Sequence, residues 1–224
     1  MFFKLIAQKM YKQFLFWFTF ISSIFYEDIS ARPISYSGGW TVMQMNDLNR
    51  HSIHLHFSPS VKYSLGYRAE YWRNREWQFH GAQFNYLLKR MNTRKSQANF
   101  YLKNGLGLAL SDHKNFQKKI EPNLFTGFAV DWEDRQYFFS YENRINFNYA
   151  IDKFVLHKAR IGLAPYIGEY GDLHTWFMLK VEKMSHVKST LVFTPMLRFF
   201  KGDYLAEVGL SNYKDFMFNF IRRY

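Results

Sequence analysis

The stretch VKYSLGYRAEY, residues 61–71, decides the fold class, because apolar and polar side chains alternate along it without a break. The odd positions are apolar or aromatic: Val61, Tyr63, Leu65, Tyr67, Ala69 and Tyr71. The even positions are polar, charged or small: Lys62, Ser64, Gly66, Arg68 and Glu70. Successive side chains of a β-strand point to opposite faces, so this period of two predicts a strand with one apolar and one polar face.

The same alternation recurs along the chain, and no segment after residue 31 shows the 3.6-residue period of an amphipathic helix. Turn-forming pairs such as Gly171-Asp172 and Gly202-Asp203 separate the runs. The pattern predicts about twelve strands (ten to twelve), near residues 40–46, 51–58, 61–73, 76–90, 96–110, 118–132, 135–150, 154–169, 173–184, 187–201, 203–211 and 214–224. An even number of strands returns the chain to the side on which it started.

Residues 1–31 predict a cleaved export signal. Three lysines, Lys4, Lys9 and Lys12, precede an apolar run over residues 14–25. That run is too short to cross a bilayer, since a transmembrane helix needs about 20 residues. Cleavage after Ala31 leaves residues 32–224 as one domain, and the alternative for the run is a buried helix or a membrane anchor. The chain has no cysteine, which excludes disulfides and thiolate metal sites.

Alternation alone leaves open whether the apolar face points into a soluble barrel or sandwich, or outward to lipid. The chain has 25 Phe and 16 Tyr, and the rows of them on the apolar face are too bulky to share one small lumen. Aromatic residues near the ends of several runs fit an interfacial girdle. We therefore expect an all-β, transmembrane, antiparallel up-and-down β-barrel in the outer membrane of a Gram-negative bacterium. Its surroundings would be outer-membrane lipids and lipopolysaccharide.

The formal net charge of +12 does not indicate nucleic-acid binding, because the basic residues are dispersed among acidic ones. In the barrel, nine basic and six acidic residues are expected on the lumenal face: Lys62, Arg68, Glu70, Lys103, Glu121, Asp131, Glu142, Arg144, Lys158, Arg160, Lys180, Glu182, Lys188, Arg198 and Glu207. Such a mixture can line a small channel with a slight preference for anions. It can equally form ion pairs that block the lumen, as in a structural envelope protein.

The end of the chain resembles the C-terminal β-signal of bacterial outer-membrane proteins, because Phe216, Phe218, Phe220 and the terminal Tyr224 alternate with polar or basic residues. That family pattern more often ends in Phe. The resemblance implies that the last strand closes the barrel and is read by the barrel assembly machinery.

Three segments resemble an uncharacterised family of Gram-negative exported proteins that is associated with copper and heavy-metal resistance: HLHFSPSVKYSLGY (54–67), FNYLLKRMN (84–92) and SQANFYLKNGLG (96–107). The resemblance implies a role in copper handling. It supplies no catalytic residues.

One set of residues points to a metal site independently of that resemblance. If residues 40–46 and 51–57 form a hairpin with a two-residue turn at Leu48-Asn49, Met43 faces His54 and Thr41 faces His56. Met43, Met45, His54 and His56 then share the lumenal face. Thioether and imidazole are ligands that suit Cu(I), so these four residues are a candidate copper site. The alternative is that they serve only packing and hydrogen bonding.

A second alternative is an outer-membrane lipid hydrolase that uses the His-x-Ser pair of His56 and Ser58, in which the imidazole activates the hydroxyl. In the hairpin register above, both side chains face the lumen rather than lipid. No supporting carboxylate or amide can be assigned from the sequence, so we expect no catalytic residues.

Overall fold

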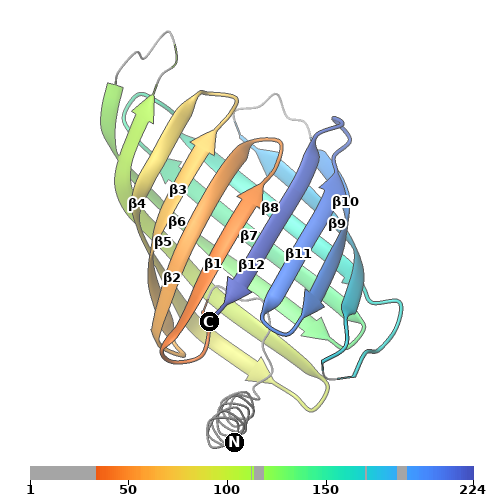
Figure 1. Ribbon diagram of the computed structural model, residues 1–224. Coiled ribbons are helices and arrows are strands. Elements are labelled where there is room, and N and C mark those ends of the chain that lie inside the picture. The colour runs from red at the N-terminus through yellow and green to blue at the C-terminus, as the bar shows by residue number, and fades with distance from the viewer. Residues whose placement is uncertain (1–33, 112, 114–118, 170, 186–190) are drawn as a thin grey trace, which may run out of the picture. The chain divides into compact units, whose positions relative to one another are not determined.

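The computed structural model describes residues 34–111, 113, 119–169, 171–185 and 191–224. These residues form twelve strands: β1 (Gly39–Asn46), β2 (Arg50–Ser60), β3 (Tyr63–Trp72), β4 (Trp77–Asn92), β5 (Ser96–Ser111), β6 (Lys119–Asp134), β7 (Tyr137–Phe147), β8 (Phe154–Leu163), β9 (His174–Met184), β10 (Val192–Lys201), β11 (Tyr204–Leu210) and β12 (Phe216–Arg223). Each strand pairs antiparallel with its neighbours in the chain, and β1 also pairs with β12 (Figure 1). The predicted all-β, twelve-stranded up-and-down barrel is confirmed.

The barrel has two distinguishable ends. At the terminal end β1 begins and β12 finishes, and Trp40 and Tyr224 exchange two backbone hydrogen bonds of 3.1 and 2.9 Å. The far end carries the turns between β1 and β2 and between β3 and β4, where the Arg73 N–H donates to the Asn49 carbonyl at 2.9 Å. The predicted export signal over residues 1–31 lies outside the described residues and stays a prediction. No helix among the described residues is long and apolar enough to span a membrane.

The two faces of the barrel wall differ in the way that the alternation predicts. Large apolar side chains point outward from strand after strand and remain exposed, such as Ile53 at 56%, Leu106 at 64% and Phe216 at 66%. Most inward positions are buried and polar or charged, as at Ser64, Arg68 and Glu70 of β3. A soluble barrel would place these two sets the other way round.

The expectation that bulky aromatic residues stay out of the lumen is wrong for one set of buried side chains: Trp72, Trp77, Phe79, Phe125 and Phe154. Glycines make room for them. Gly105 lies opposite Phe125 in the β5–β6 register, and a Cβ at Gly105 would lie 2.1 Å from the Phe125 ring. The missing side chain therefore lets one large ring occupy the space of two inward positions.

Candidate functional site

The β1–β2 hairpin has the predicted register. Met43 is the partner of His54, and Thr41 is the partner of His56. The turn is held by Asp47, whose side chain accepts hydrogen bonds from the backbone N–H groups of Asn49 and Arg50 at 3.0 and 3.1 Å. Asp favours this position because its short carboxylate can bond to its own turn. The local sequence thus fixes which side chains of β1 and β2 face inward.

His54 and His56 point into the barrel, where they are 5% and 1% exposed. Their rings meet edge to face with centroids 5.9 Å apart. His54 Nε2 has no hydrogen-bond partner among the described residues. Gly66 leaves space beside His56, since a Cβ there would lie 2.7 Å from His56 Nδ1. The pair thus offers one uncommitted buried ring nitrogen.

Met43 and Met45 share the inward face with the two histidines and are half-buried. The described residues contain no group of three or more His, Cys, Asp or Glu side chains able to hold a metal ion. A metal at this place would therefore depend on the thioethers as well as the imidazoles.

The His-x-Ser pair is not arranged for catalysis. Ser58 and His56 both face the interior, and neither is more than 1% exposed. The Ser58 hydroxyl oxygen accepts a hydrogen bond from the Ser35 N–H at 3.0 Å, and His56 Nδ1 lies 3.5 Å from Asn85 Nδ2. The described contacts do not place the imidazole on the hydroxyl, so the structure offers this alternative no support.

Glu70 is the centre of the charged interior. Its side chain is fully buried and contacts three guanidinium groups, those of Arg50, Arg68 and Arg144. Arg50 Nη1 lies 3.3 Å from Glu70 Oε1, and Arg144 Nη2 lies 2.8 Å from Glu70 Oε2. Glu70 is on β3 and Arg144 on β7, with three strands between them in the sheet. The ion pair therefore crosses the lumen rather than running along the wall.

The arginines also stack on the interior aromatic rings. The Arg144 guanidinium carbon lies 4.1 Å from the centroid of Phe125 and 5.4 Å from that of Trp72. The Arg50 guanidinium carbon also lies 5.4 Å from the centroid of Trp72. Planar guanidinium groups combine bidentate pairing with stacking, which lysine cannot do. Rings and guanidinium groups together fill the barrel at this level.

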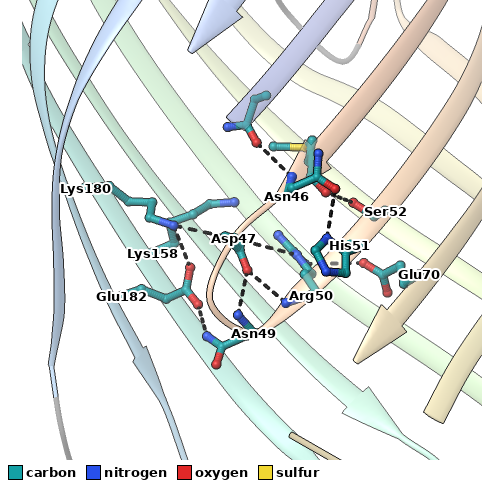
Figure 2. Close-up of polar contacts among 12 residues, drawn as sticks. Asn46, Asp47, Asn49, Arg50, His51, Ser52, Glu70, Lys158, Lys180 and Glu182 are labelled. Atoms are coloured by element: carbon teal, nitrogen blue, oxygen red, sulfur yellow. Dashed lines mark hydrogen bonds and ion pairs between the residues drawn. The ribbon is translucent and has the colours of Figure 1, made fainter. Parts of the chain in front are cut away.

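At the far end, the β1–β2 turn reaches across to β9 and contacts Lys180 and Glu182 (Figure 2). Asn49 Nδ2 donates to Glu182 Oε1 at 2.6 Å, and Asp47 Oδ2 lies 3.9 Å from Lys180 Nζ. Burial alone would raise the pKa of the Asp47 carboxyl. The charges of Lys180 and Arg50 and the Asn49 N–H outweigh that effect, so the pKa of Asp47 lies below its ordinary value. Asp47 is therefore an anion that holds the turn in place.

Two further carboxylates tie strands together nearer the terminal end. Glu142 on β7 pairs with Lys103 at 2.9 Å and with Lys158 at 3.2 Å. Glu207 on β11 lies 2.7 Å from Arg198 Nη2 and 3.3 Å from Arg160 Nη1. Arg160 belongs to β8, three strands away in the sheet. The interior is thus bridged at several levels.

At the terminal end, the segment that precedes β1 enters the barrel. Ile34 is buried and packs against Leu87, Tyr101 and Ala129, which are inward residues of β4, β5 and β6. The Gly38 N–H donates to the Ser58 carbonyl at 2.7 Å, which anchors the segment to β2. The segment before β1 therefore packs against the inward faces of β4, β5 and β6 at the terminal end.

Most of the predicted lumenal charges lie inside the barrel, and Lys62 does not. Lys62 is exposed in the β2–β3 turn, because the turn begins one residue before it and removes it from the alternation. Two buried charges, Arg50 and Asp47, were not among the predicted lumenal residues. The prediction for Lys188 lies outside the described residues. The alternation of inward and outward side chains fails at the strand ends, because turns change the direction in which side chains point.

Comparisons with known proteins give limited matches. No family model and no curated protein matches this chain. Two solved structures are similar to it: "KdgM porin in complex with disordered oligogalacturonate", with a TM-score of 0.46, and "KdgM porin", with 0.47. Each is 11% identical and covers 83% of this chain and 98% of the other. Neither links this chain to copper resistance, and the proposals below rest on its own residues.

Proposed function

We propose that this protein is an outer-membrane β-barrel that acts as a small channel, and that the arrangement described here is its closed state. The observation that carries the proposal is the inverted wall, apolar outside and charged inside. Contiguous exposed apolar surface on this scale marks contact with lipid or with another protein. The exposed apolar residues lie on all twelve strands or beside them, so the apolar surface surrounds the barrel. Lipid can cover such a surface on every side, whereas a single protein partner would cover only part of it.

Strand length agrees with a membrane location. β8 and β10 have 10 residues each. At a rise of about 3.3 Å per residue and a tilt of about 40°, ten residues cover about 25 Å, which matches the apolar band of outer-membrane barrels. A closed barrel also leaves no unpaired strand edge in lipid.

The short turns assign the orientation. The connections over residues 61–62, 93–95, 135–136 and 202–203 lie at the terminal end, and the segment 164–173 is the exception there. Outer-membrane barrels keep short turns on the periplasmic side. We therefore assign the terminal end to the periplasm and the far end to the cell exterior. The outward Phe216, Phe218 and Phe220 of β12 remain the proposed signal for the barrel assembly machinery.

The charged interior favours a channel over a purely structural barrel. Buried ion pairs add little net stability compared with well-packed apolar residues, so a barrel that only had to be stable would not need them. Ion pairs can instead exchange partners with water and with passing ions. Glu70, Glu142 and Glu207 and their basic partners line such a path, and the basic excess predicts a slight preference for anions.

Conductance in planar bilayers tests the channel. Wild-type protein should give rare, small steps, because the β1–β2 turn and the Glu70 pairs close the lumen. The variant Asp47→Asn/Asn49→Ala, which removes the contacts to Lys180 and Glu182, should open much more often. The matched control is His51→Ala, an exposed residue at the same turn. If neither wild type nor variant conducts, the barrel is a structural envelope component.

A second candidate function is soft-metal binding, which the partnerless His54 Nε2 favours. Met43, Met45, His54 and His56 would supply neutral thioether and imidazole ligands suited to Cu(I). Titration of the refolded barrel with Cu(I) in detergent should show stoichiometric uptake that is lost in His54→Ala/His56→Ala. His51→Ala/His80→Ala removes two outward histidines and should leave uptake unchanged. Equal uptake by both variants would count against the site.

A further inference from the structure

A row of polar residues lies on the outer, otherwise apolar face of the barrel, where it has no part in the lumenal ion pairs. Asn143 of β7, His157 of β8 and Lys183 of β9 are successive Cα partners across the three strands. His157 and Lys183 are exposed, and Asn143 is half-buried. The sequence places these residues on separate strands without a shared motif, and the sheet register brings them side by side. The row interrupts the apolar surface formed by neighbours such as Ile161 and Phe147.

The hydrogen bonds of His157 fix the role of its free nitrogen. Tyr141 Oη lies 2.7 Å from His157 Nδ1, and Asn143 Nδ2 lies 3.4 Å from the same atom. An amide NH₂ can only donate, so His157 Nδ1 accepts and the proton of the neutral ring sits on Nε2. Nε2 has no hydrogen-bond partner within the part of the chain that the structure describes. It is a donor on an exposed side chain.

A second tyrosine–histidine pair lies on the outer face, and there both ring nitrogens of the histidine have hydrogen-bond partners. Tyr67 Oη lies 2.7 Å from His80 Nδ1, the same distance as in the first pair. There, however, Gln78 Oε1 lies 3.1 Å from His80 Nε2 and accepts its hydrogen bond. The chain therefore satisfies one outward imidazole internally. The other is left to an external acceptor.

The position of the row identifies that acceptor. His157 is the fourth residue of β8 counted from the far end, about 10 Å along the strand. With a tilt of about 40° this is about 8 Å below the rim, in the outer part of the apolar band and just below the lipid headgroups. Lys183 adds a positive charge whose long side chain can extend to that level. A cation beside one or more N–H donors suits a phosphate oxygen.

We propose that His157 and Lys183 bind the phosphate of an outer-leaflet lipid headgroup, with Asn143 and Tyr141 in contact with the imidazole. The inference rests on the proposed membrane location and on the assignment of the far end to the exterior. His157 Nε2 donates to a phosphate oxygen, Lys183 pairs with its charge, and Tyr141 holds the imidazole in the donating tautomer. An unpaired N–H facing hydrocarbon is costly, and the phosphate removes that cost.

Native mass spectrometry of the intact barrel in detergent tests the proposal with diphosphoryl lipid A as the probe. Wild-type protein should retain the lipid, and His157→Phe/Lys183→Gln should lose about tenfold in apparent affinity, since it removes one charge-assisted contact and one hydrogen bond. Lipid A without phosphates should bind wild type as weakly as diphosphoryl lipid A binds the variant. His80→Phe, which changes the internally satisfied pair, should bind like wild type.

Equal lipid retention by wild type and by His157→Phe/Lys183→Gln would overturn the site. So would full competition by millimolar inorganic phosphate, which would indicate a site for the free anion. Co-flotation with lipid vesicles and heat-modifiable migration of both proteins are measured in parallel. A barrel that floats but shows no phosphate preference refutes this inference alone, whereas a barrel that does not float refutes the proposed function.

Discussion

Glu70 compensates three arginines from a fully buried position, so its removal should be among the most costly single changes in the barrel. Glu70→Ala leaves the guanidinium groups of Arg68 and Arg144 without their counter-charge, whereas Arg50 keeps Asp47. We expect a loss of about 3–5 kcal/mol in the free energy of unfolding, the usual cost of breaking a buried ion pair. Urea unfolding in lipid vesicles, followed by tryptophan fluorescence, measures this loss.

The control for that change is Glu169→Ala, which removes an exposed carboxylate and should alter the unfolding free energy by less than about 0.5 kcal/mol. A Glu70→Ala barrel as stable as this control would mean that water, rather than Glu70, neutralises the arginines. The ion pair between Glu70 and Arg144 would then not keep the channel closed.

The sequence predicts which residues face each other better than it predicts what fills the interior. The Met43–His54 register follows from the turn residues, because a slip of one residue would expose the whole apolar face. The inward Phe125 could not be placed in contact with Arg144 in this way. The environment of Phe125 depends on Gly105 of the neighbouring strand β5 and on Arg144 of β7. Neither the separation of these residues in the sequence nor the two-residue alternation indicates that they are in contact.

At the scale of elements, the β1–β2 turn is predicted to respond to acid. The pKa of Asp47 is lowered in the folded protein, so its contribution is complete above its unfolded value of about 3.9 and is lost as pH falls through the folded pKa. Protonation removes the anion that faces Lys180, Arg50 and the more distant Lys158. Conductance should therefore rise only when the pH is lowered below the ordinary carboxyl value of about 3.9.

The variant Asp47→Asn separates this turn from other acid effects. The amide cannot ionise, so the variant should already open frequently at pH 7, and its conductance should change little on acidification. If wild type and Asp47→Asn show the same rise with acid, Asp47 does not control the opening.

The segment before β1 should act as the closure of the terminal end. Ile34→Asp would place a carboxylate among Leu87, Tyr101 and Ala129, where it has no basic partner among the described contacts. The segment is then expected to leave the mouth of the barrel, because an unpaired buried charge costs several kcal/mol. Single-channel recordings should show more frequent opening. Ser37→Asp adds the same charge at an exposed position and should behave like wild type.

This segment also shows the limit of element prediction. The alternation locates all twelve strands, because each one repeats the same pattern over seven or more residues. Ile34 belongs to no run, and nothing in its neighbours along the chain indicates burial. Its contacts are Leu87, Tyr101 and Ala129 of β4, β5 and β6, and each of these residues lies more than fifty positions away. Closure of a barrel by a short irregular segment is a tertiary property.

For the whole molecule, function depends on which face meets lipid. The polar interior, the bridges from Glu70 and the headgroup site at His157 have their proposed meaning only if the exposed apolar wall lies in a membrane. The absence of cysteine in the full sequence makes this directly measurable, since a single introduced cysteine is the only thiol in the chain.

The decisive measurement is lipid quenching of a bimane label on such single cysteines in the vesicle-reconstituted barrel. Leu106→Cys and Ile161→Cys point outward, whereas Thr194→Cys points inward and is 1% exposed. We expect brominated lipids to quench the two outward labels strongly and to leave the inward label unaffected. Outward labels that are untouched by brominated lipid and quenched by aqueous iodide would contradict a membrane barrel and would indicate a wall covered by a protein partner or by water.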